Sequence, residues 1–329
     1  MSGPRPVATT RAVTLAALMA ALGRPWWWML ALAGFLVRGG IALFLVAIVS
    51  LPSPLAVSNV LAPIITPIYF GRLEPATAAL IAVAIIAALA WLLGGSWIAA
   101  ATEVVLVRDA RGAALDEGLP VADLPSGGRM LVTRAAAAHL ISLVPLAVVA
   151  GLGSVAIVNV AYRELVNPSD SGPVVVRVLA GASGPVAAIV AAWVLGELVG
   201  GGAVRRIVLL GDSVLGSVGR AAVDLVRRPI GSLVAPFATI AVLALDLTAV
   251  LLVVAIVWSD IRDRLVDPRS DPLAATLTLV TFAGAWCLAL AVTGLVTTWR
   301  SVAMSFETDR AAAADLVRGH AASTSASPA

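Results

Sequence analysis

Long apolar runs alternate with short polar segments along most of the chain, and this alternation predicts its secondary structure. Six runs approach or exceed the roughly 20 apolar residues that a helix needs to cross a hydrocarbon core about 30 Å thick. A buried helix of a soluble domain would be shorter and would keep a polar stripe. We therefore predict an all-α, polytopic transmembrane bundle within residues 11–310, with spans at about 27–50, 76–100, 138–160, 178–202, 230–257 and 274–298.

The six spans form three pairs, because one pattern recurs about every 100 residues: a short helix, a span, a loop and a second span. The second span of the first two pairs carries Trp-x-x-Gly, at Trp91 to Gly94 and at Trp193 to Gly196. The third pair keeps only Gly294 at the matching place. The pattern favours three similar helix pairs in one domain.

The segment before the fifth span is the clearest amphipathic stretch. Its apolar face holds Val214, Leu215, Val218, Ala222, Leu225 and Val226. Its polar face holds Ser213, Ser217, Arg220, Asp224 and Arg227. We expect a helix in the cytoplasmic membrane interface, with weaker versions at 12–23 and 128–139. Packing on its own bundle and binding of a lipid or a partner both stay open as its use.

The two ends of the chain and the first outer loop depart from this pattern. Residues 1–10 and 311–329 are polar or small, and we expect disordered tails there. The loop 51–75 is apolar, but five prolines prevent a regular span. It either caps the bundle or is re-entrant, and in the second case protein must cover it, because lipid does not tolerate irregular backbone.

Composition agrees with a membrane environment, since 60% of the 329 residues are apolar and 12% are charged. The net charge is +3 and the arginines are scattered between spans, which argues against nucleic-acid binding. All basic side chains are arginine, which is typical of GC-rich bacterial coding. We therefore expect the bacterial cytoplasmic membrane as the location and the lipid bilayer as the first partner.

The distribution of the 22 arginines predicts the orientation, because loops rich in Arg and Lys stay in the cytoplasm. With a cytoplasmic N terminus, fifteen arginines lie in inner segments, six lie in outer loops and Arg38 lies within the first span. We expect both termini in the cytoplasm. The aromatic run Trp26 to Trp28 fits an anchor at that face.

Four charged residues lie inside or near the ends of spans. They are Arg38, Glu103, Glu197 and Asp246. A charge at the centre of a membrane helix costs at least about 2.5–3.5 kcal/mol on insertion scales, so we expect these side chains to face the protein interior. They either line a substrate or proton path or form structural ion pairs, with Arg38 and Asp246 as one suggested pair.

The fourth span also contains a small-xxx-small packing face. Gly196 and Gly200 are four residues apart, and Gly201 and Gly202 follow. Small residues let two membrane helices approach closely. Packing within one chain and formation of a homo-oligomer are both compatible with this face.

The most tempting catalytic motif is Gly181-Ala-Ser-Gly184, which resembles the serine motif of rhomboid intramembrane proteases. A nucleophilic serine needs a base. Of the two histidines, His320 lies in the C-terminal tail, and His139 lies at the inner end of the third span, most of a membrane away from Ser183. We therefore expect no catalytic residue. Two histidines and one cysteine also exclude an ordinary zinc or di-iron site, so we expect neither metal nor cofactor.

The layout of a short helix, Arg227-Arg228-Pro229, a span, a loop and a second span resembles poorly characterised bacterial six-helix families. Some of these are described as membrane domains related to glycerophosphodiester phosphodiesterase. That enzyme's catalytic domain is a separate soluble unit, so the resemblance implies no catalytic residue here.

Three functions remain after this reading. The first is a non-enzymatic membrane component that acts as a scaffold for a partner or lipid. The second is a transporter or channel subunit that uses the mid-membrane charges. The third is an intramembrane hydrolase, for which the sequence offers no base.

Overall fold

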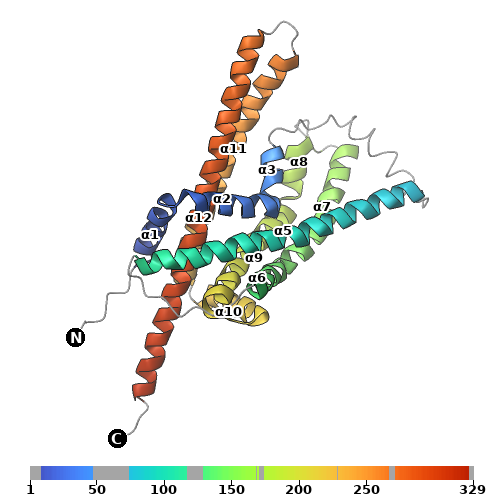
Figure 1. Cartoon of the computed structure of the whole chain (residues 1–329). Helices are drawn as coiled ribbons and strands as arrows, with labels where there is room; N and C mark the ends of the chain where they lie inside the picture. Colours follow the sequence, from blue (N-terminus) through green and yellow to red (C-terminus); the bar gives the residue numbers. More distant parts are fainter. Residues whose placement is uncertain are drawn as a thin grey trace. The chain divides into compact units, whose positions relative to one another are not determined.

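The computed structural model describes residues 9–46, 74–116, 129–167, 169, 174–227, 229–266 and 271–325 (Figure 1). These ranges are almost entirely helical and contain no β-strand. Six stretches are long and apolar enough to cross a membrane: Pro25–Leu45, Pro75–Asp116, Met130–Glu164, Ser183–Leu210, Phe237–Trp258 and Pro272–Ala312. The predicted all-α bundle with six spans is confirmed.

The helices repeat one order three times: a short helix, a first span and a second span. The short helices are α1 (Thr10–Leu22), α6 (Arg129–Ser142) and α10 (Val214–Arg227). The first spans are α2 (Pro25–Phe35) continued by η1 (Leu36–Gly40) and α3 (Ile41–Val46), then α7 (Val144–Val166), then α11 (Pro229–Val266). The second spans are α5 (Pro75–Asp116), α8 (Val174–Gly181) continued by α9 (Ser183–Leu210), and α12 (Pro272–Ser325).

A proline separates each short helix from the span that follows it. Pro25 and Pro229 begin α2 and α11, and Pro145 lies in the first turn of α7. Proline is tolerated in a first turn, where its missing N–H would have no helical partner, but it cannot continue a helix that precedes it. The short helices are therefore separate elements and do not simply prolong the spans.

The first span is interrupted near its middle. The helix is kinked at η1, where Gly39 has φ 111°, a positive value that glycine adopts readily. Arg38 directly precedes this glycine. A milder break lies at Ala182, between α8 and α9, where φ is −105° and ψ is 18°.

Second spans extend further than their apolar runs. The helix α5 continues to Asp116, and α9 continues to Leu210, where Gly211 in the left-handed region ends it. The helix α12 continues to Ser325, through most of the expected tail 311–329, because Ala311 to Ala314 are strong helix formers. Residues 1–8, most of the loop 51–75 and residues 326–329 lie outside the described residues.

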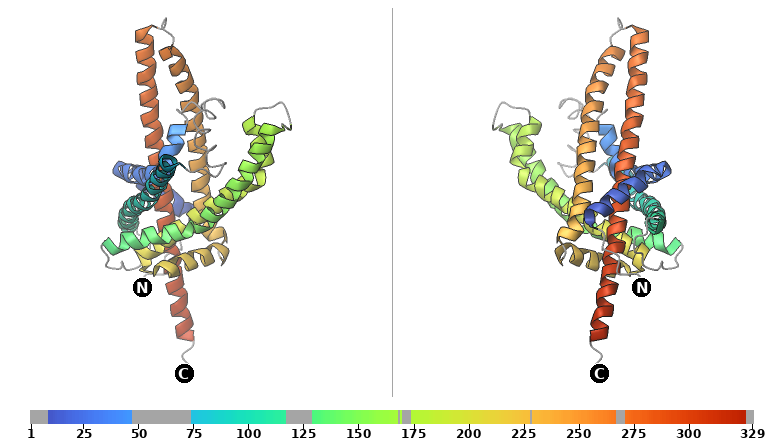
Figure 2. Two further views of the ribbon diagram at one scale, coloured as in Figure 1. Left: turned by 90° about the vertical axis from the view of Figure 1, so that its right-hand side faces the viewer. Right: turned by 90° about the vertical axis from the view of Figure 1, so that its left-hand side faces the viewer.

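Contacts between residues divide the chain into two compact units. Unit 1 contains Met1–Ala20, Val104–Ala238 and Arg300–Ala329, and unit 2 contains Ala21–Glu103 and Thr239–Trp299. Within unit 1, α9 packs along α6, α7 and α10, as the two views in Figure 2 also show. Its core consists of small and apolar side chains that are at most 2% exposed, among them Val13, Val107, Ala138, Ile207, Val302 and Phe306.

Large apolar side chains point outward along the spans. In the first half of α5, Leu80, Val83 and Ile86 are 57%, 63% and 65% exposed. A water-soluble protein rarely exposes a contiguous apolar surface of this kind, whereas a lipid-facing helix requires one. The exposure pattern thus agrees with the length and composition of the spans.

Candidate functional site

A buried carboxylate joins three helices of unit 1. Glu197 on α9 accepts a hydrogen bond from Arg300 Nη2 of α12 at 2.7 Å, and its other oxygen lies 3.6 Å from His139 Nε2 of α6. The Glu197 and Arg300 side chains are 14% and 18% exposed, and that of His139 is 3% exposed. Glu197 therefore links α9 to two other helices, through an ion pair with Arg300 and a contact with the His139 imidazole.

Arg205 forms a second link between α9 and α12, eight residues after Glu197 or about two helical turns along the same helix. The residue is 1% exposed, and its guanidinium donates to the carbonyl and the hydroxyl of Ser301 and to the carbonyl of Gly201. The sequence analysis did not single out Arg205. The sequence feature that could have pointed to Arg205 is its two-turn spacing from Glu197, because that spacing puts both residues toward one side of α9.

Glycines on α9 make these links possible by bringing the helices close together. A Cβ atom at Gly200 would lie 2.7 Å from His139 Nδ1, and one at Gly196 would lie 3.1 Å from the Ser142 carbonyl oxygen. Both proposed packing glycines therefore face α6 of the same chain. On another side of α9, a Cβ at Gly201 would approach Met304 of α12 at 3.0 Å.

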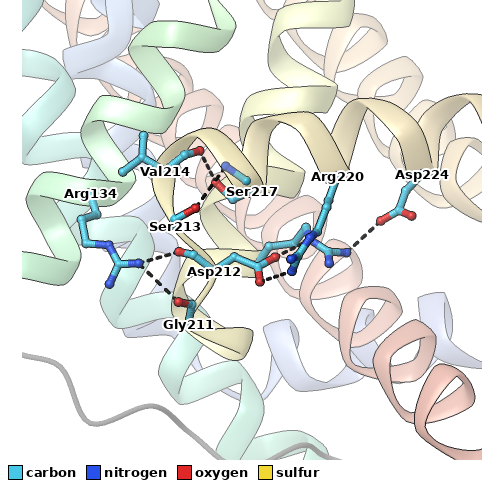
Figure 3. A network of polar contacts seen from close by, with 10 residues as sticks. Arg134, Gly211, Asp212, Ser213, Val214, Ser217, Arg220 and Asp224 are labelled. Atoms are coloured by element: carbon cyan, nitrogen blue, oxygen red, sulfur yellow. Dashed lines mark hydrogen bonds and ion pairs between the residues drawn. The ribbon is translucent and has the colours of Figure 1, made fainter. Parts of the chain in front are cut away.

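An aspartate at the corner between α9 and α10 is the centre of a network of polar contacts (Figure 3). The Asp212 carboxylate accepts hydrogen bonds from Arg206 at 2.9 Å and from Arg220. The backbone carbonyl oxygen of Asp212 accepts a hydrogen bond from Arg134 of α6 at 2.6 Å. Arg206 also donates to Asp224 at 2.8 Å. Asp212 thus fixes the start of α10 against α6 and α9.

Another charged pair is buried where α5 and α12 extend beyond their apolar runs. Asp309 is 2% exposed and Arg111 is 6% exposed, and the arginine acts electrostatically on the carboxylate. Neither Asp309 oxygen has a hydrogen-bond partner among the described residues. Arg111 stands near the end of α5, outside every span the sequence predicted, and hydropathy carried no signal for its burial.

In unit 2, the first span meets α5 through small residues. A Cβ at Gly34 would lie 2.7 Å from Thr102 Oγ1, and one at Gly95 would lie 3.0 Å from the Val37 carbonyl oxygen. This approach places Arg38 Nη2 3.3 Å from Glu103 Oε2, with both side chains less than a quarter exposed.

Asp246 has a different partner from the one suggested by the sequence. Its Oδ2 accepts a hydrogen bond from Thr293 Oγ1 of α12 at 3.1 Å, and Thr293 is fully buried. The suggested pair of Arg38 with Asp246 is therefore replaced by two separate contacts, because α5 supplies a closer carboxylate to Arg38.

The rhomboid-like serine lies far from His139, the described histidine. Ser183 begins α9, and His139 contacts α9 near Glu197. The 14 intervening steps of one continuous helix correspond to about 21 Å. No group of three or more His, Cys, Asp or Glu side chains that could hold a metal ion occurs among the residues that the structure describes.

These features define a multi-pass α-helical membrane protein in which the four charged candidates each contact a partner inside the chain. No model of a known protein family matches the chain, and neither a curated protein nor a solved structure matches it.

Proposed function

We propose that this protein is a non-enzymatic structural component of a bacterial cytoplasmic membrane, a scaffold with both termini in the cytoplasm. The observation that carries the proposal is that each charged candidate contacts a side chain of the same protein, in two ion pairs and in one hydrogen bond to a neutral hydroxyl. Arg38 contacts Glu103, Glu197 contacts Arg300, and Asp246 contacts Thr293. A solute path needs charged groups that water and substrate can reach, whereas each of these groups contacts another side chain of the protein.

The cost of burying charge supports the same view. An unpaired charge inside a membrane helix is expensive, and removal of one partner from a buried pair is strongly destabilising. The Glu197 contacts join α6, α9 and α12, so their effect is to hold helices together. The orientation rests on the excess of arginines, fifteen against six, in the segments assigned to the cytoplasm.

Cysteine accessibility tests the proposal without removal of the charges. Ser142→Cys, Ser301→Cys and Thr293→Cys, each in a Cys287→Ala background, place near-isosteric thiols beside the charged contacts. The three native side chains are at most 7% exposed. The exposed residue Ser169 supplies the control, Ser169→Cys.

The reagent is a membrane-impermeant maleimide, applied from both sides of reconstituted vesicles. A structural core predicts labelling of the control alone. Labelling at two or more of the core positions, in variants with an unchanged elution profile and melting temperature, would reveal an aqueous route and overturn the proposal.

A transporter or channel subunit is the second candidate, and one observation favours it. Arg38 precedes Gly39 at the kink that interrupts the first span. Broken helices form the binding sites of many transporters. The same labelling experiment separates this candidate from a scaffold.

The proposed scaffold also needs a partner, and we propose another membrane protein. The resemblance in layout to membrane domains related to glycerophosphodiester phosphodiesterase suggests an accessory role beside another membrane protein. A homo-oligomer is the alternative. Crosslinking in native membranes followed by mass measurement distinguishes a second copy from a different chain. An intramembrane hydrolase is the third function, and the distance between Ser183 and His139 argues against it.

A further inference from the structure

The short helix α10 is turned the opposite way from an amphipathic helix of a soluble protein. Its buried residues are Ser217, which is fully buried, and Ala221, which is 9% exposed. Ala221 packs against α9, since a Cβ at Gly202 would lie 3.3 Å from the Ala221 Cβ. The protein core thus takes the side of α10 that carries small residues.

Three of the larger apolar side chains of α10 point away from the chain, while Val214, Val218 and Leu225 are half-buried. Leu215 is 73% exposed, Val226 is 78% exposed and Val223 is 45% exposed. Leu215 and Val226 are 11 residues apart, about three turns, and therefore share one stripe of the helix. Among the residues that the structure describes, none removes this outer stripe from water, and a helix of a soluble protein would have buried it.

Arginines border the outer stripe on one side. Arg220 and Arg227 are seven residues apart and form a second row, roughly a third of a turn around the helix from Leu215 and Val226. The Arg220 side chain is 62% exposed although it also contacts Asp212. Asp224, the acidic residue of this helix, is held by Arg206 of α9. The exposed surface is therefore apolar along one row and basic along the next.

The position of α10 in the chain places this surface beside a bilayer. The helix ends at Arg227, and α11, which contains the fifth span, begins at Pro229. From Ile230 onward the sequence of α11 is largely apolar. A short helix directly before a span lies close to the headgroup region by chain connection alone.

We propose that α10 is an interfacial helix that inserts its outer stripe among lipid acyl chains and binds anionic phospholipid headgroups with Arg220 and Arg227. The arginine stems extend along the apolar surface while their guanidinium groups contact phosphate. This inference does not depend on the choice between scaffold and transporter, because it needs only the membrane spans and the orientation of α10. The second occupant to be tested is another copy of the chain.

The test uses the full chain in vesicles, with one environment-sensitive fluorophore on a single cysteine in a Cys287→Ala background. Val226→Cys reports the outer stripe. Ser213→Cys, an exposed position on the polar side at the start of the same helix, is the matched control. A quencher attached to lipid acyl chains should reduce fluorescence at Val226→Cys at least about twofold more than at Ser213→Cys.

The headgroup part is tested by lipid composition. In vesicles of phosphatidylcholine with phosphatidylglycerol, quenching at Val226→Cys should exceed that in phosphatidylcholine alone. An Arg220→Gln, Arg227→Gln variant should remove that difference, with each arginine contributing about fivefold to the ratio of inserted to detached helix.

Three results would overturn the inference. Equal quenching at the two positions would show that the outer stripe does not enter the bilayer. Quenching that is independent of phosphatidylglycerol would remove the anionic headgroup from the proposal. Protection of Val226→Cys in detergent, together with crosslinked dimers through that cysteine, would identify a second copy as the occupant. An unchanged elution profile in every variant shows that the fold is intact.

Discussion

Three glycines at matching places in the second spans should respond very differently to one added methyl group. A Cβ at Gly294 would lie 2.8 Å from the carbonyl oxygen of Trp28, which is backbone and cannot move independently of α2. A Cβ at Gly196 would lie 3.1 Å from the Ser142 carbonyl oxygen and at the same distance from a Leu143 methyl. A Cβ at Gly94 would meet nothing within 4 Å.

The expected change in the free energy of unfolding follows from a comparison of the three alanine variants with one another. Each Gly→Ala change gains helix propensity, up to about 1 kcal/mol in water, and this gain is similar at the three positions. Overpacking against fixed atoms costs about 1–3 kcal/mol. The difference between variants therefore isolates the packing cost. We expect Gly294→Ala to unfold about 1–3 kcal/mol more easily than Gly94→Ala, with Gly196→Ala between them.

The assay is reversible unfolding of the purified full chain in mixed micelles by increasing sodium dodecyl sulfate, monitored by circular dichroism. The unsubstituted chain and Gly94→Ala serve as references. Equal stability of Gly294→Ala and Gly94→Ala would refute the close contact between α12 and α2. A larger loss at Gly94 than at Gly294 would refute the reasoning about the three positions altogether.

Three further changes test the polar contacts, the first two by the same unfolding assay and the third by limited proteolysis. Glu197→Gln should cost about 1.5–3 kcal/mol, because the largely buried Arg300 guanidinium loses its negatively charged acceptor, and an unchanged midpoint would contradict this role. Arg38→Gln should destabilise the chain more than the double variant Arg38→Gln, Glu103→Gln, which leaves no unpaired charge; additive losses would argue against the pair. Asp212→Asn should increase proteolysis at the corner before α10 relative to the unsubstituted chain, and an unchanged cleavage rate would show that the network does not hold this corner.

The six spans, their order and their pairing could be predicted from the sequence because transfer from water to lipid is a local and nearly additive property. A run such as 76–100 is apolar enough to enter the membrane whatever its neighbours are. Proline after a short polar segment is also a local signal, and it marked the boundary at Pro229 before α11. These features need no knowledge of which helices touch.

Partners of the charged residues could not be obtained this way. Arg38 could have paired with any carboxylate at a similar depth, and hydropathy suggested Asp246. The contact with Glu103 arises because Gly34 and Gly95 let α5 approach the first span closely. Helix crossing depends on the shapes of both surfaces, and a single sequence read one segment at a time contains only one of them.

For α10 too, the sequence predicted the helix and its two faces, and tertiary packing decided which face is buried. Its two faces were evident from residue spacing, and both packing on the bundle and lipid binding were compatible with them. The tertiary structure decided that Ser217 and Ala221 face the protein and that Leu215 and Val226 face outward. The physical reason is close packing: small side chains at Gly202 and Ala221 allow α9 and α10 to approach, so the bulky apolar row has room only on the far side of the helix.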